Sequence, residues 1–70
     1  MKTNYLGREY ANLNAAAAAW AADQELSGNT EIPAHEQATL IQAYAPRNAA
    51  QGVRGDLWDR ACIEALAARI

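Results

Sequence analysis

Residues 14–26 read NAAAAAWAADQEL, a run in which seven of thirteen residues are alanine. Alanine has the highest helix propensity of the amino acids, so the run predicts a stiff helix. Its side chain buries little area, and burial stabilises by only about 25 cal/mol per Å². A face lined by methyl groups nevertheless allows a neighbouring helix to lie close to it. We therefore expect a helix whose alanines permit the close approach of another helix. The alternative is that exposed alanines serve only to raise helix propensity.

The core that this chain can build is thin. Its 18 alanines make up half of the hydrophobic residues in 70, beside eleven Leu, Ile and Val and no Phe. A domain of this size buries only about 60% of the surface of its unfolded chain. The two Trp and three Tyr must therefore carry much of the packing. We expect one domain over residues 1–70, and additional buried area from a homodimer contact.

Apolar residues recur at spacings of three and four, which is typical of amphipathic helices. The sequence predicts an all-α domain with helices over residues 4–27, 33–45 and 56–70. Thr3 or Asn4 is expected to cap the first helix and Gly28 to end it. Pro46 is expected to end the second helix. No segment alternates with the period of two that marks a strand, so no sheet is expected.

The first helix has apolar side chains on two sides. One set contains larger residues and the other is mainly alanine, as expected of a helix that packs against two neighbours. The residues predicted to form this helix-packing or dimer face are Leu6, Tyr10, Leu13, Ala15, Ala19, Trp20, Ala22 and Leu26.

Charge is unevenly distributed along the chain. No Lys or Arg lies between Arg8 and Arg47, so the first part is acidic and suits a basic partner surface. The connection before the third helix is rich in Arg and Trp, residue types enriched at binding hot spots. The predicted partner-binding residues are Asp23, Glu25, Glu31, Glu36, Arg47, Arg54 and Trp58. Each of these has a simpler interpretation as a solvated charge or a core tryptophan.

Residues that could carry catalysis or bind a metal are few. His35 is the single histidine and Cys62 the single cysteine, too few for a metal site with three or four ligands within one chain. Cys62 lies between the two faces of its helix and is expected to be a small buried apolar residue. We expect no catalytic residue, no metal and no cofactor.

These observations predict a non-enzymatic protein-interaction module. The single cysteine and the lack of a leader or membrane segment favour the cytoplasm, and the Ala and Arg content favours a bacterial or phage source. The leading hypothesis is a small regulator or inhibitor that binds and blocks a larger protein.

Two alternatives stay open. One is a helix-turn-helix-like DNA-binding regulator, although the sequence pI of about 5.1 and the eleven-residue connection expected before the third helix count against it. The other is a structural or assembly protein, which would form large oligomers.

Overall fold

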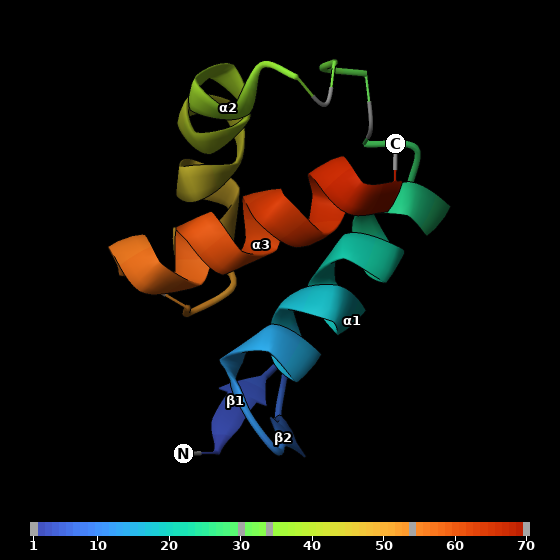
Figure 1. The fold of residues 1–70 in the computed structure, drawn as a ribbon. Coiled ribbons are helices and arrows are strands. Elements are labelled where there is room, and N and C mark those ends of the chain that lie inside the picture. Colours follow the sequence, from blue (N-terminus) through green and yellow to red (C-terminus); the bar gives the residue numbers. More distant parts are fainter. Residues whose placement is uncertain (1, 30, 34, 54, 70) are drawn as a thin grey trace.

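The computed structural model describes residues 2–29, 31–33, 35–53 and 55–69. Within these residues the fold is mostly helical, as expected, with three helices and one small two-stranded sheet (Figure 1). The elements in chain order are β1 (Thr3–Tyr5), β2 (Arg8–Tyr10), α1 (Leu13–Leu26), α2 (Gln37–Ala50) and α3 (Asp56–Arg69). The expectation of no sheet is therefore wrong.

An antiparallel hairpin replaces the start of the expected first helix. The strands pair Thr3 with Tyr10 and Tyr5 with Arg8. The turn residues Leu6 and Gly7 have φ of 50° and 78°, which matches the two positive values of a type I′ hairpin turn. The Asn4 side-chain oxygen accepts a hydrogen bond of 3.1 Å from the Gly7 N–H. Asn4 therefore stabilises this turn and caps no helix.

Helix α1 begins at Leu13, later than the sequence predicts, but it ends at Leu26, close to the predicted boundary. Asn12 is the N-cap, and its side-chain oxygen accepts a hydrogen bond of 2.8 Å from the Ala15 N–H. After Leu26, Gly28 adopts φ of 74°, and the Asn29 N–H reaches back to the carbonyl of Gln24. This is the hydrogen-bond pattern of a Schellman stop, so the prediction for Gly28 is confirmed.

Helix α2 is displaced from its expected position. The carbonyl of Pro33 accepts a hydrogen bond from the Glu36 N–H in a turn, and the helix begins only at Gln37. It passes through Pro46, which was expected to end it, and stops at Ala50. Proline inside a helix costs about 3 kcal/mol. Continuing past it buries Asn48, which donates a 2.9 Å hydrogen bond to Asp59 of α3.

Helix α3 is the central element and packs against both α1 and α2. The fully buried large side chains come from all three helices and include Trp20, Tyr44, Leu40, Ile63 and Leu66. Trp20 of α1 meets Tyr44 of α2 edge to face, with ring centroids 5.5 Å apart. Aromatic residues thus carry much of the packing, as the composition implies.

Alanines of α1 are buried in the core, but they are not the ones that the sequence assigns to the packing face, since Ala15, Ala19 and Ala22 are only half-buried. Ala16, Ala17 and Ala21 are buried, with at most 1% of their surface exposed. Helices α1 and α3 lie side by side (Figure 1), and a salt bridge from Arg69 to Glu25 joins their C-terminal ends.

Candidate interaction surface

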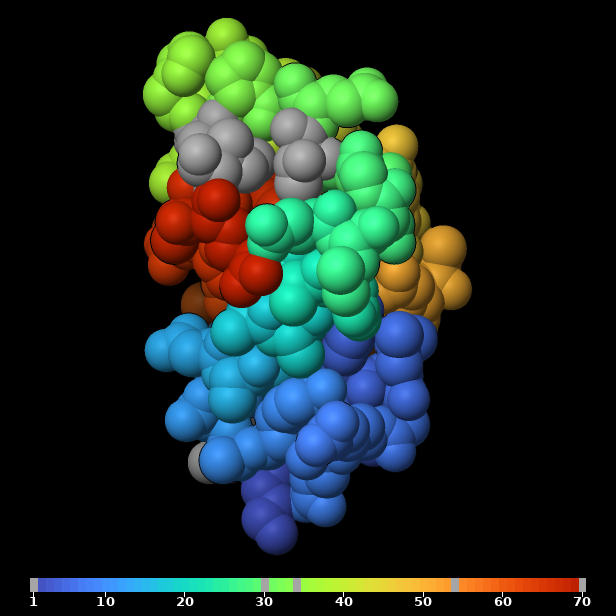
Figure 2. All heavy atoms as spheres, turned by 90° about the vertical axis from the view of Figure 1, so that its right-hand side faces the viewer, coloured from blue at the N-terminus to red at the C-terminus, as the bar shows by residue number. Residues whose placement is uncertain are grey.

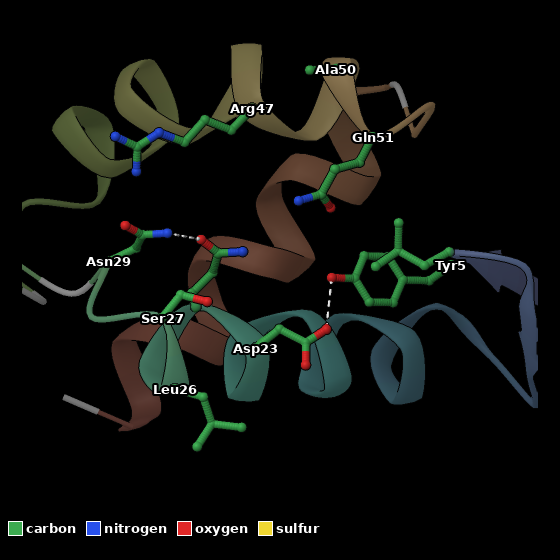
Figure 3. A pocket seen from close by; sticks show the side chains of 10 residues that line it. Tyr5, Asp23, Leu26, Ser27, Asn29, Arg47, Ala50 and Gln51 are labelled. Atoms are coloured by element: carbon green, nitrogen blue, oxygen red, sulfur yellow. Dashed lines mark hydrogen bonds between the residues drawn. The ribbon is translucent and has the colours of Figure 1, made fainter.

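An open groove lies between α1, α2 and the hairpin turn and has a volume of about 560 Å³. In Figure 2 the hairpin (blue), the end of α1 (green) and the end of α2 (orange) meet on the right-hand side of the molecule. Figure 3 shows the groove from close by, with α1 on one side and α2 on the other. We call it the α1–α2 groove. Its lining residues are Tyr5, Leu6, Asp23, Gln24, Leu26, Ser27, Asn29, Arg47, Ala50 and Gln51.

Two strongly exposed leucines border this groove, but the side chain of Leu26 points away from α2 and from the space between the helices (Figure 3). Leu6 is 61% exposed and Leu26 is 87% exposed. Leu6 also has φ of 50°, and among the described residues no other residue except glycine has a positive φ. The left-handed conformation costs an ordinary residue about 1–2 kcal/mol, and Asn or Gly usually occupies it. Leucine at position 6 is thus unfavourable for folding in two ways: its backbone is in a left-handed conformation, and its apolar side chain is exposed to water.

A hydrogen bond fixes one wall of the groove. The Tyr5 hydroxyl donates to a carboxylate oxygen of Asp23 over 2.9 Å, which joins β1 to α1 (Figure 3). Burial, followed by this hydrogen bond, raises the pKa of the Tyr5 phenol well above its ordinary value of 10.0. Tyr5 is therefore a neutral donor at physiological pH, and Asp23 presents its carboxylate at the groove.

Arg47 of α2 supplies positive charge to the opposite wall. Its guanidinium lies 5.0 Å from the ring centroid of Tyr44, within the range of a cation–π contact. Arg47 lines the α1–α2 groove and also a small adjoining hollow of about 90 Å³ that Glu31 borders. The groove therefore carries an acid on α1 and a base on α2, and the amide of Gln51 also projects into it from α2 (Figure 3).

The structure brings together part of the predicted partner-binding set. Asp23 and Arg47 share the groove, and Glu31 borders the hollow beside Arg47. The two surfaces that the sequence treats separately thus meet at one place.

The remaining predicted partner-binding residues lie elsewhere. Glu25 pairs with Arg69 at the end of α3, and Glu36 is exposed beside His35 at 3.7 Å. Trp58 is only 4% exposed, and its ring lies 5.8 Å from that of Tyr5, so it belongs to the core. Arg54 lies outside the described residues.

The predicted helix-packing or dimer face does not form one continuous helix side. Leu6 and Tyr10 belong to the hairpin, Trp20 is fully buried, and Leu26 is exposed. The other four are half-buried: Leu13, Ala15, Ala19 and Ala22. Their use in a dimer stays a prediction.

Sequence reasoning missed six residues of the groove, namely Tyr5, Gln24, Ser27, Asn29, Ala50 and Gln51. The available signal was Asn4 followed by Leu6–Gly7, a short turn sequence between two tyrosines. Strands of three residues are too short to show the alternation of apolar and polar residues that identifies a sheet. The spacing of Leu6, Tyr10 and Leu13, which is typical of a helix, was therefore the stronger signal.

A second open groove of about 600 Å³ lies where the hairpin and the first turns of α1 and α3 meet. Leu57, which is 76% exposed, lines it together with Leu13 and Trp58. This groove is more apolar than the first, and the only charged residue among its described lining is Asp56.

Cys62 is fully buried, as its position on α3 predicts. Burial and, second, the charge of Asp59 raise the pKa of its thiol above the ordinary 9.0, which keeps it protonated and unreactive. Over the described ranges, no group of three or more His, Cys, Asp and Glu is placed to hold a metal ion. None of the helices in the same ranges has the length and hydropathy needed to cross a bilayer.

Comparisons of the chain with protein-family models, with curated proteins and with solved structures found no match.

Proposed function

We propose that this chain is a non-enzymatic interaction module, a small bacterial or phage regulator or inhibitor that acts in the cytoplasm. Its α1–α2 groove would receive a segment of a larger protein partner and so block that partner. The chain would act as a homodimer, because a thin core with exposed apolar side chains gains stability from a second copy.

The observation that carries this proposal is the state of Leu6. Folding alone favours Asn or Gly at a turn position with φ of 50°, and it favours a polar side chain at 61% exposure. A residue that is unfavourable on both counts is a sign of use in binding. Leu26, 87% exposed on the outer edge of the same groove, offers a further apolar contact to a partner segment that extends past α1.

The polar groups of the groove define the chemistry of the partner segment. Leu6 fits an apolar side chain of the partner segment. Arg47 on α2 fits a carboxylate or a backbone carbonyl, and Asp23 on α1 fits a basic side chain or a backbone N–H. A segment with an apolar anchor flanked by an acid and a base would satisfy all of these groups. Because Tyr5 is held neutral and bonded to Asp23, the groove is better suited to binding than to proton transfer.

The test is a differential capture experiment in lysate of the organism that encodes the chain. Tagged wild type is compared with a groove variant, Leu6→Asn with Leu26→Ser, and with the control Ala38→Ser, which alters an exposed apolar residue of α2 that does not line the groove. The proposal expects one protein that wild type and the control retain and that the groove variant loses at least about tenfold. Equal recovery by all three, or no retained protein, would contradict it.

The DNA-binding alternative is favoured by one observation. Residues 51–55 alone connect α2 to α3, far fewer than the eleven expected, so the connection approaches the short turn of a helix-turn-helix. However, α3 is packed on both sides, and its exposed residues include Asp56 and Glu64, which would repel phosphate. A gel shift at about 50 mM salt that weakens steeply as salt is added would favour this alternative over partner binding.

A further inference from the structure

Helix α3 exposes a narrow stripe on the side away from the core. The stripe consists of Leu57, Arg60, Glu64 and Ala68, all exposed and spaced by three or four residues. The opposite side of the same helix buries Cys62, Ile63 and Leu66. We call these four residues the α3 stripe.

The two charges of the α3 stripe are not used within the fold. The ion pairs among the described residues join Lys2 to Glu9, His35 to Glu36 and Arg69 to Glu25. Arg60 and Glu64 make no ion pair with any residue in these ranges. A partner that presents an acid opposite Arg60 and a base opposite Glu64 would therefore be complementary.

A second α3 stripe laid antiparallel meets this requirement. If a two-fold axis passes midway between Arg60 and Glu64, Arg60 of one copy faces Glu64 of the other, and the pair forms twice. The same arrangement places the long side chain of Leu57 opposite the small residues Ala67 and Ala68 of the second copy. Charge and size are thus complementary between two identical stripes.

We propose that a second copy of this chain docks on the α3 stripe to form a two-fold symmetric dimer. This inference rests on the homodimer of the proposed function and assigns its contact to α3. It does not involve the α1–α2 groove, which stays open to a partner.

The area that a stable dimer needs extends the contact beyond α3. Such an interface buries about 800 Å² on each side, whereas the whole chain exposes 4486 Å². One helix stripe cannot supply this area, and α1 lies beside the C-terminal part of α3 in both views (Figures 1 and 2). Ala18 is exposed and Ala22 half-buried on α1, so their methyl groups leave room for the second copy. The contact would therefore have to extend from the α3 stripe onto a neighbouring element such as α1.

The test is a charge exchange followed by sedimentation velocity across a range of protein concentrations. Arg60→Glu and Glu64→Arg each convert two attractive pairs of the dimer into two repulsive ones, and each is expected to weaken dimerisation at least about tenfold. The double variant Arg60→Glu with Glu64→Arg restores opposite charges and is expected to recover the wild-type dissociation constant within about threefold. Lys2→Glu is the matched control for Arg60→Glu, because it makes the same change in charge at an exposed residue that precedes β1 and lies outside the α3 stripe.

Each outcome decides between the proposals. A wild type that stays monomeric at several hundred micromolar overturns both the homodimer and the α3 contact. A dimer that the single variants do not weaken, or that the double variant does not restore, overturns only the α3 contact. The groove variant Leu6→Asn with Leu26→Ser should keep the wild-type dimer, so failure of partner binding is read separately. Circular dichroism of each variant confirms that it folds.

Discussion

The Tyr5 hydroxyl donates a 2.9 Å hydrogen bond to Asp23, and this bond fastens the N-terminal hairpin to the C-terminal half of α1. A two-stranded hairpin is only marginally stable by itself in water. Its strands here have three residues each, so the hairpin depends on contacts with the helices. Tyr5 supplies two of these contacts, because its ring also packs against Trp58 of α3.

Replacing Tyr5 by Phe should keep the ring contact and remove only the hydrogen bond. Because Asp23 is exposed and can bind water instead, we expect a loss of about 0.5–1.5 kcal/mol in the free energy of unfolding. Urea unfolding measures it. A double-mutant cycle with Asp23→Ala isolates the pair, and a coupling energy near zero would contradict the structural role given to this bond.

Stability should fall in alkaline solution from about pH 9 upward. Burial raises the pKa of Cys62 above 9.0, and burial raises the pKa of Tyr5 and Tyr44 above 10.0. Above these ordinary pKa values the unfolded state releases protons that the folded state keeps. The stabilisation contributed by the three groups is therefore complete below the ordinary pKa values and is lost as the pH rises above them. Urea midpoints between pH 8 and 11 measure the decrease. In Cys62→Ala the fall should begin nearer pH 10; an unchanged profile would show that the thiol contributes nothing.

Leu6→Asn should make the isolated protein more stable. Asn tolerates the left-handed backbone better than Leu and removes an exposed apolar side chain, so we expect a gain of about 0.5–1 kcal/mol. Gly7→Ala is the contrasting variant: with φ of 78° and open space around a new Cβ, it tests backbone strain alone and should destabilise. Thermal unfolding compares the two. If Leu6→Asn is destabilising, Leu6 serves folding and the central observation for a binding groove is lost.

Enlarging a buried alanine of α1 should be costly, whereas enlarging an exposed one should not. Ala16 is fully buried and Ala18 is exposed on the same helix. Overpacking a well-packed core costs about 1–3 kcal/mol, so Ala16→Leu should lower the free energy of unfolding by that amount. Ala18→Leu should change it by less than about 0.5 kcal/mol. Equal effects of the two variants would mean that the alanines do not set the approach of α3.

Local chemistry in the sequence determined much of the helical structure. Alanine propensity gives α1, Gly28 ends it, and the acidic start of α3 at Asp56 coincides with the predicted boundary. These features depend on residues within a few positions of each other, so they can be read from the chain directly. The need for aromatic packing also follows from composition alone, because alanine buries too little area.

Tertiary contacts decided the hairpin, the course of α2 and the groove. The spacing of Leu6, Tyr10 and Leu13 fits a helix as well as it fits a hairpin followed by a helix, and the contact of Tyr5 with Trp58 and Asp23 favours the hairpin. Helix α2 continues through Pro46 because the buried Asn48 bonds Asp59.

Tertiary contacts also decided which alanines of residues 15–19 are buried, because either side of this helix could have faced the core. The packing of α3 buries Ala16 and Ala21 and leaves Ala18 exposed. A periodic pattern defines the faces of a helix, but which face is covered depends on where distant segments pack. For that reason the sequence alone determined that three helices form, whereas only the tertiary structure fixed the course of α2 and placed Leu6, Leu26, Asp23 and Arg47 around one groove.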